Sequence, residues 1–158
     1  MKFTSAMIVV QDMEKSRKFY ENLLNQKVLL DLGANVSYEG FALMDFKRWM
    51  EFLEKEESDF SFLKSNVYEL YFEIDDYDNF IEKLNNFKDF EVEIAHKTKE
   101  FPWGQRVIRF YDPDNHMVEV GESLESVANK FHSDGMSVEE IAKRMGIPEE
   151  NVVNLVNI

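Results

Sequence analysis

Two stretches of the chain share one pattern of hydrophobic and polar positions. Met7–Asp12 and Tyr71–Asp76 each predict a β-strand that ends at an acidic residue, and the second stretch follows the first by 64 positions. After each Asp, apolar residues recur at spacings of three and four, which is typical of an amphipathic helix with an Asp N-cap. These helix positions are Met13, Ser16, Tyr20 and Leu23 in the first stretch, and Tyr77, Phe80, Leu84 and Phe87 in the second.

Three further strands are predicted after each helix. They cover Lys27–Leu32, Val36–Asp45 and Trp49–Leu53 in the first half, and Glu91–Lys97, Gln105–Tyr111 and His116–Gly121 in the second. Asp112–Asn115 has the composition of a tight turn between the last two strands. Any two strand–helix units share some of this pattern, but here the agreement extends over strand, cap, helix and next strand. We therefore predict an α+β fold of two tandem βαβββ modules, at about residues 1–60 and 61–121.

A helical tail is predicted for residues 122–158. Apolar residues at helical spacing precede Gly135, which ends the first helix. Ser137 and Glu140 have the spacing of a capping box, and Pro148 begins a last helix.

Composition excludes several classes of function. The formal net charge is −13, which disfavours binding to nucleic acid or to an anionic membrane. The absence of cysteine excludes disulfides, thiolate metal sites and cysteine nucleophiles. No apolar run approaches the ~20 residues that span a bilayer, and the first residues lack the pattern of a secretory signal. We expect a cytoplasmic protein.

Three segments resemble the vicinal oxygen chelate superfamily, which includes glyoxalases, bleomycin-resistance proteins and extradiol dioxygenases. They are Met7–Tyr20, Leu70–Asp76 and Pro102–Val120, and with the duplication the resemblance covers about residues 1–121. It implies paired βαβββ modules whose sheets curl around a cleft, and it makes a homodimer plausible.

The resemblance also implies positions for a divalent metal. Carried over by position, the ligands would be Ser5, Glu51, Glu69 and Glu119, with Ser5 at a lost fourth position. Catalytic members use His and Glu ligands, so Zn or Ni would suit their sites, whereas carboxylates alone suit Mg or Mn. Glu69 and Glu119 are then also the candidates for proton transfer. Alternatively, the metal site is lost and these carboxylates are solvated or paired with Arg106 or Arg109.

The three histidines do not restore a histidine-containing metal site. His116 follows the predicted turn, His96 lies near the end of a predicted strand, and His132 lies in the tail. We interpret each as a surface or turn residue. No glycine-rich phosphate loop and no Ser/His/Asp set is present.

A cleft between sheets could bind a small molecule without a metal, by aromatic walls and a few polar anchors. The candidate ligand-binding residues are Tyr71, Glu73, Trp103, Gln105, Arg106, Trp49 and Phe41. Core packing is the alternative for each aromatic residue. The acidic and aromatic character of this set favours a cationic or aromatic ligand.

We therefore expect a metal-independent binding protein with a small-molecule ligand. One alternative is a divalent-metal lyase or isomerase resembling glyoxalase I, although Ser5 and Glu69 replace expected histidines. Another is a regulator whose tail acts as a helix-turn-helix. The segment from Ser137 onward has only Lys143 and Arg144 as basic residues, so a helical cap or a dimer contact is the favoured use of the tail.

Overall fold

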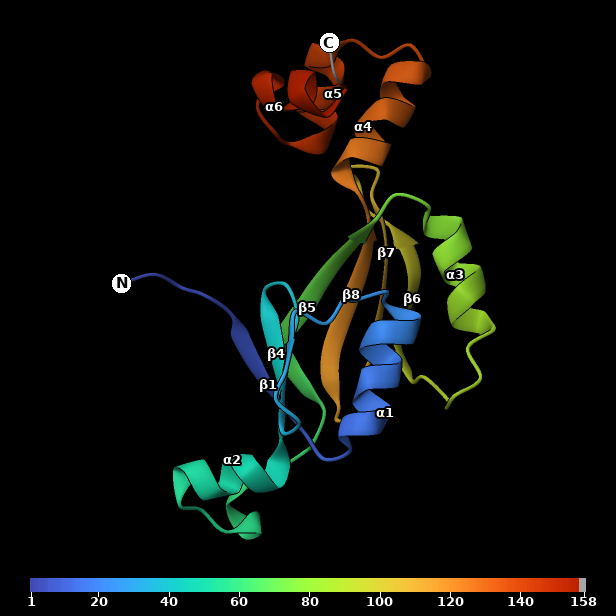
Figure 1. Ribbon diagram of the computed structural model, residues 1–158. Coiled ribbons are helices and arrows are strands. Elements are labelled where there is room, and N and C mark those ends of the chain that lie inside the picture. Colours follow the sequence, from blue (N-terminus) through green and yellow to red (C-terminus); the bar gives the residue numbers. More distant parts are fainter. Residues whose placement is uncertain (157–158) are drawn as a thin grey trace. The chain divides into compact units, whose positions relative to one another are not determined.

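The computed structural model describes residues 1–156 (Figure 1). These residues form two compact units. The first unit contains residues 1–68, 86–93 and 111–117, and the second contains residues 69–85, 94–110 and 118–156. Each unit is described by itself below. The predicted tail runs to residue 158, and its last two residues lie outside the described part.

The two sheets have the same strand order, which confirms the duplicated α+β fold. The first sheet has the order β1-β4-β3-β2 and the second the order β5-β8-β7-β6. In the first sheet β1 pairs with β4 in parallel, and the other pairs are antiparallel. The strands are β1 (Ala6–Val10), β2 (Leu30–Asp31), β3 (Asn35–Ser37), β4 (Phe41–Asp45), β5 (Ser65–Ile74), β6 (Ile94–Glu100), β7 (Arg106–Tyr111) and β8 (His116–Glu122).

Each module begins with a strand and a helix, as the periodicity predicts. The first helix is α1 (Met13–Arg17), which continues into the wider turns of η1 (Lys18–Leu23), and Asp12 caps it by accepting a hydrogen bond from the backbone N–H of Lys15 at 3.0 Å. The second is α3 (Tyr77–Asn85), where Asp76 accepts from the N–H of Asn79 at 3.1 Å. Both predicted caps are confirmed.

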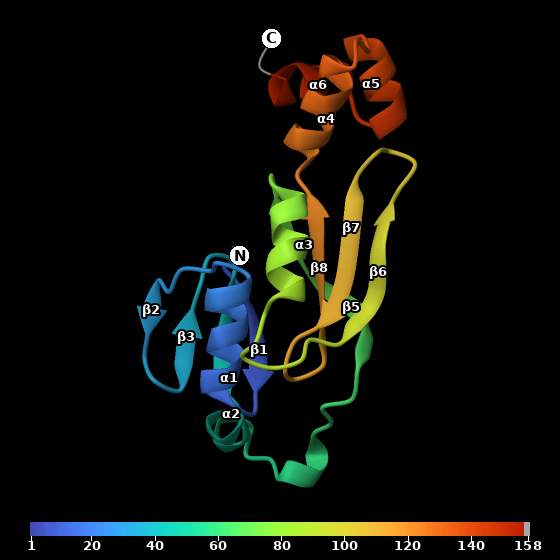
Figure 2. The ribbon, with the colours of Figure 1, turned by 90° about the vertical axis from the view of Figure 1, so that its right-hand side faces the viewer.

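The helices bury the faces that the spacing predicts. Ser16, Tyr20 and Leu23 are fully buried in the first unit. In the second unit Tyr77 and Phe80 are buried, and the Phe80 and Phe110 rings stack with centroids 6.3 Å apart. Because Phe110 lies on β7, α3 covers one face of the second sheet (Figure 2).

Two strand predictions in the first module are wrong. Val36–Asp45 is not one strand, because the chain reverses at Gly40, whose φ of 81° favours glycine, and so forms β3 and β4. The predicted strand Trp49–Leu53 lies within helix α2 (Phe46–Leu53), since Asp45 caps it by accepting from the N–H of Arg48 at 3.0 Å. The third strand after the first helix is therefore β4. A short 3₁₀ turn, η2 (Glu57–Asp59), follows α2.

The predicted turn before β8 is confirmed. Asn115 has a φ of 68°, and its N–H donates to the carbonyl of Asp112 at 3.1 Å. The strands around it lie close to their predicted positions, although β6 begins at Ile94 rather than Glu91.

The tail folds into three helices that share an apolar cluster (Figure 1). They are α4 (Leu124–Ser133), α5 (Val138–Met145) and α6 (Glu149–Leu155). The capping box of Ser137 and Glu140 is present at the start of α5. Within residues 1–156 no helix is long and apolar enough to cross a lipid bilayer.

One residue of the tail packs on the loop before β7. The ring of Phe131 lies so close to Gly104 that a Cβ on this glycine would be 2.2 Å from the tip of the ring. Gly104 also has a φ of 90°, which side chains rarely adopt. The tail is therefore attached to the second unit by a backbone contact that only glycine permits.

We predict that Gly104→Ala lowers the free energy of unfolding by about 1–3 kcal/mol more than Gly135→Ala. Gly135 has a nearly identical φ of 89° but no neighbour within 4 Å of an added Cβ, so it controls for the backbone strain alone. Chemical denaturation of both variants measures the difference. Equal losses would show that Phe131 does not occupy the space beside Gly104.

Candidate functional site

The face of the second sheet opposite α3 gathers charged and polar side chains. Alternation along β7 directs Arg106 and Phe110 toward α3, since Arg106 lies over the Tyr77 ring at 4.9 Å. Arg109 lies an odd number of positions from both residues, so its side chain projects from the opposite face of the sheet. Here it meets residues of β5 and β8, which makes this open face the candidate site.

At the centre of the open face, Arg109 lies between two carboxylates. Its Nε donates to Oε2 of Glu69 at 3.0 Å, and its Nη2 forms an ion pair with Glu119. Glu119 is 7% exposed, whereas Glu69 is solvent-accessible. Burial raises the pKa of Glu119; Arg109 lowers it and the neighbouring Glu69 raises it, and the net change is upward. The guanidinium thus holds together two acidic groups that would otherwise repel each other.

A chain of hydrogen bonds fixes the groups at one end of this face. Trp103 Nε1 donates to Oε1 of Gln105 at 3.0 Å. Gln105 Nε2 donates to the Tyr71 hydroxyl and to the carbonyl of Glu122, both at 2.8 Å. The Tyr71 hydroxyl in turn donates to Glu73 at 2.8 Å. Tyr71 and Glu73 remain exposed, so they are oriented but accessible.

Gly121 makes this arrangement possible, and the sequence reasoning missed it. A Cβ at this position would lie 2.9 Å from Gln105 Nε2 and 3.2 Å from the Tyr71 ring. The absence of a side chain therefore lets Gln105 and Tyr71 meet across β8. A lone glycine inside a predicted strand was the only available signal for this close approach.

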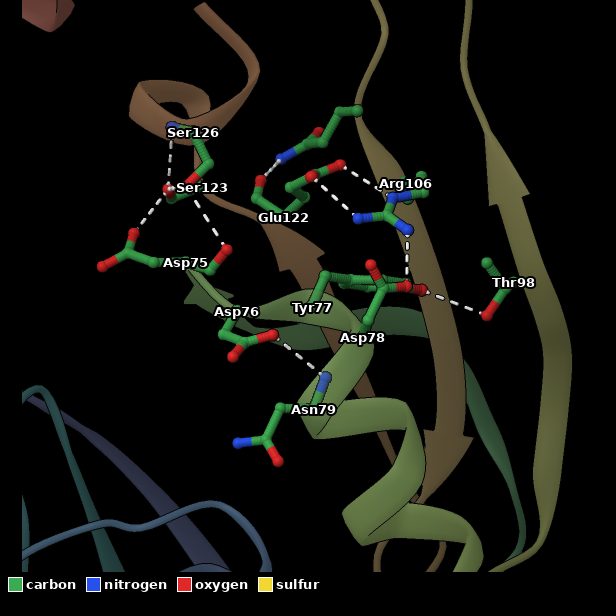
Figure 3. Close-up of polar contacts among 11 residues, drawn as sticks. Asp75, Asp76, Tyr77, Asp78, Asn79, Thr98, Arg106, Glu122, Ser123 and Ser126 are labelled. Carbon is green, nitrogen blue, oxygen red and sulfur yellow. Dashed lines mark hydrogen bonds and ion pairs between the residues drawn. The ribbon is translucent and has the colours of Figure 1, made fainter. Parts of the chain in front are cut away.

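Arg106 belongs to a different network, on the side of α3. Its guanidinium bonds to both carboxylate oxygens of Glu122 at 3.0 Å and to Asp78 at 2.7 Å (Figure 3). Hydrogen bonding to Glu122 raises the pKa of Arg106, so it stays charged. The hydroxyl of Ser123 donates to Asp75 at 2.6 Å nearby, which joins the end of β5 to the start of the tail (Figure 3). Arg106 is thus placed to hold structure together, not on the open face.

The candidates of the first unit are distributed among several elements. Ser5 is exposed just before β1. Glu51 lies on α2, not on a strand as predicted, and pairs with Arg48 at 2.7 Å on the surface. Phe41 is buried and stacks on Tyr38 with ring centroids 4.8 Å apart, so it belongs to the core. Trp49 lies on α2 and lines a cavity within the first unit.

Two histidines are less exposed than predicted. His96 lies on β6 opposite Arg109, and its Nδ1 is buried without a hydrogen-bond partner among residues 1–156. His116 is partly buried, and its Nδ1 lies 2.8 Å from Oδ2 of Asp112. His132 is exposed on α4, as predicted.

The residues of the open face do not fit a divalent ion. Only Glu69 and Glu119 come together there, and the Arg109 guanidinium already pairs with both. No group of three or more His, Asp or Glu side chains suited to a metal occurs in the described part of the chain. A cation between these two carboxylates would have to displace Arg109, which costs more than binding to free carboxylates.

The sequence profile of the glyoxalase-like domain family matches residues 3–125. The chain belongs to this family. This match confirms the resemblance to the vicinal oxygen chelate superfamily that the three sequence segments predict. The matched residues include both sheets, whereas α5 and α6 lie beyond them.

Solved structures show the same fold. A protein of unknown function from Agrobacterium tumefaciens strain C58 is 36% identical, with a TM-score of 0.69 over 78% of this chain and 95% of its own. The fosfomycin resistance protein FosX from Listeria monocytogenes is 20% identical, with a TM-score of 0.57 over 80% of this chain and 97% of its own. A lactoylglutathione lyase from Agrobacterium tumefaciens is 18% identical, with a TM-score of 0.55 over 77% and 93%. No curated protein sequence matches the chain.

We predict that Arg109→Leu lowers the free energy of unfolding by about 2–4 kcal/mol near pH 7.5, because it leaves a buried Glu119 beside Glu69 without a counter-charge. The loss should be smaller near pH 4.5. The folded pKa of Glu119 lies above its ordinary value of 4.5. Glu119 therefore contributes to the free energy of unfolding below that pH, and this contribution is lost as the pH rises through the folded pKa. Removing Arg109 raises the folded pKa of Glu119 further.

Denaturation curves at the two pH values measure this dependence. Arg48→Leu is the matched control, since Arg48 pairs with Glu51 in a solvent-exposed position and should lose little at either pH. The double variant Arg109→Leu/Glu119→Gln should recover part of the loss near pH 7.5. A loss that does not change with pH would contradict the role of Arg109 as the counter-charge.

Proposed function

We propose that the protein binds a small molecule on the open face of the second sheet, without a metal. The observation that supports this most is the hydrogen-bond chain through Trp103, Gln105, Tyr71 and Glu73. It holds an exposed ring and an exposed carboxylate in a fixed orientation, and preorganised groups of this kind lose little entropy when a ligand binds. Packing needs of the sheet alone do not explain an ordered, solvent-facing chain of this kind.

The charge on this face favours a cationic ligand. Glu69, Glu73 and Glu119 are three acidic groups, and Arg109 is the only basic partner that they are found to contact within residues 1–156. Even with Glu119 protonated, Arg109 balances only one of the two remaining carboxylates, so this group of side chains keeps one negative charge. Glu73, which accepts from a neutral hydroxyl, is the group that would meet a cation.

The rings of Phe101, Trp103 and Tyr71 favour an aromatic or otherwise planar ligand. Phe101 and Trp103 stack with ring centroids 4.6 Å apart, and Arg109 lies over Phe101 at 5.9 Å. Tyr71 presents a further exposed ring. Such rings bind cations by their faces and planar groups by stacking. We therefore propose a cationic aromatic molecule as the ligand class.

A metal-dependent lyase resembling glyoxalase I is the weaker proposal. A lactoylglutathione lyase shares the fold, but at 18% identity this likeness extends only to architecture. Arg109 between the two carboxylates argues against an ion at this face. If the protein is catalytic, Glu119 with its raised pKa is the group best suited to exchange a proton.

Three further properties of the protein are predictions: its compartment, its oligomeric state and its lack of nucleic-acid binding. We expect a cytoplasmic protein, and the exposed Leu29, Leu30 and Leu32 at the edge strand β2 offer a surface for a homodimer. We expect no binding to nucleic acid, because α6 begins with Glu149 and Glu150 and contains no basic residue.

A panel of cationic aromatic compounds should raise the melting temperature of the protein, and neutral or anionic analogues of the same size should not. Glu73→Gln should weaken binding of the best compound about five- to tenfold, because it removes the charge that faces the cation. Titration calorimetry measures this effect. Glu51→Gln, which neutralises an exposed carboxylate of the first unit, should leave the affinity unchanged. Equal binding of cationic and anionic analogues would contradict the proposal.

Purified protein dialysed against Zn, Ni, Mn or Mg should retain less than one equivalent of metal by elemental analysis. The physical reason is that Arg109 already pairs with both carboxylates that lie together. Retention of one equivalent that disappears in Glu119→Gln, together with isomerisation of a hemithioacetal, would instead support the lyase.

A further inference from the structure

We propose a second small-molecule site within the first unit, in which the Nε2 atom of His116 accepts a hydrogen bond from an aromatic hydroxyl group. The site is a cavity of about 370 Å³. Its lining is mostly apolar and aromatic, and includes Met7, Trp49, Phe60, Tyr68 and His116. This volume suffices for one substituted ring.

The tautomer of His116 is determined by Asp112. The carboxylate of Asp112 is buried, and its Oδ2 lies 2.8 Å from His116 Nδ1. The same oxygen accepts from the hydroxyl of Tyr20 at 2.7 Å, while Oδ1 accepts from the N–H groups of Asp114 and His116. A carboxylate accepts but does not donate, so Nδ1 must hold the proton. In the neutral ring Nε2 is then an acceptor.

The hydrogen bond found for the His116 ring within residues 1–156 uses Nδ1, and none is found for Nε2. His116 lines the cavity, and its ring centroid lies 6.1 Å from that of Tyr68. An O–H group of a ligand in the cavity can therefore pair with Nε2. The ring is held by Asp112, so a donor that enters the cavity meets an acceptor that is already oriented.

The surrounding charges favour a neutral donor over an anion. Asp114 also lines the cavity and is buried, and Asp112 lies behind the imidazole. An aromatic carboxylate would face both groups. A phenol instead brings an uncharged O–H for Nε2 and a ring for the walls formed by Trp49 and Phe60. This site uses none of the residues proposed for the cationic ligand.

Histidine side-chain ¹⁵N spectra of the intact protein provide the test. Titration with 4-methylphenol should shift the Nε2 resonance of His116 and leave that of His132 unchanged. The methyl ether of the same compound should bind about five- to tenfold more weakly, because it lacks the donor. Benzoate should bind more weakly than 4-methylphenol.

Two variants separate this site from the open face of the second sheet. His116→Gln should weaken binding of 4-methylphenol about five- to tenfold, whereas His132→Gln should not, and both should bind the cationic compound like the original protein. The spectra of the original protein give the answer even if His116→Gln fails to fold. Equal affinity for the phenol and its ether, or no shift of His116 on saturation, would overturn the proposal.

Discussion

The buried carboxylate of Asp112 is the interaction on which the first unit depends most. It accepts hydrogen bonds from the Tyr20 hydroxyl, from two backbone N–H groups of its own turn, and from the ring of His116. Burial, reinforced by Asp112, raises the pKa of Tyr20, which therefore remains a donor. A buried carboxylate is tolerable only with such a complete set of donors. The helix of the first module and the turn before β8 are thereby joined through one side chain.

Arg109 has the corresponding position on the open face of the second sheet. It pairs with Glu69 and Glu119, two of the carboxylates that the superfamily resemblance assigns to a metal. Fold and chemistry are separate questions here, because Arg109 contacts both of these carboxylates.

The repeat, the caps and the turn could be predicted because their signals are local. Asp12, Asp76 and Asn115 determine backbone geometry within a few residues of themselves. The error at Trp49–Leu53 arose because a short apolar segment fits both a strand and a helix, and the Asp45 cap decided between them. From the sequence alone, the pairing of Arg109 stays open and the contact of Gly121 with Gln105 is not predicted. Both depend on which strands are neighbours, and no spacing within one strand contains that information.

The contact of Phe131 with Gly104 connects the tail to the loop that carries Trp103 and Gln105. Gly104 lies between Trp103 and Gln105, which orient the groups of the open face, and the ring of Phe131 packs directly on it. The family profile ends at residue 125, before Phe131. On the proposal that the open face binds a ligand, substitutions in the added helices would change the shape of the loop at Gly104 while every residue proposed to face the ligand is kept. The tail would then tune ligand preference without supplying a residue that contacts the ligand.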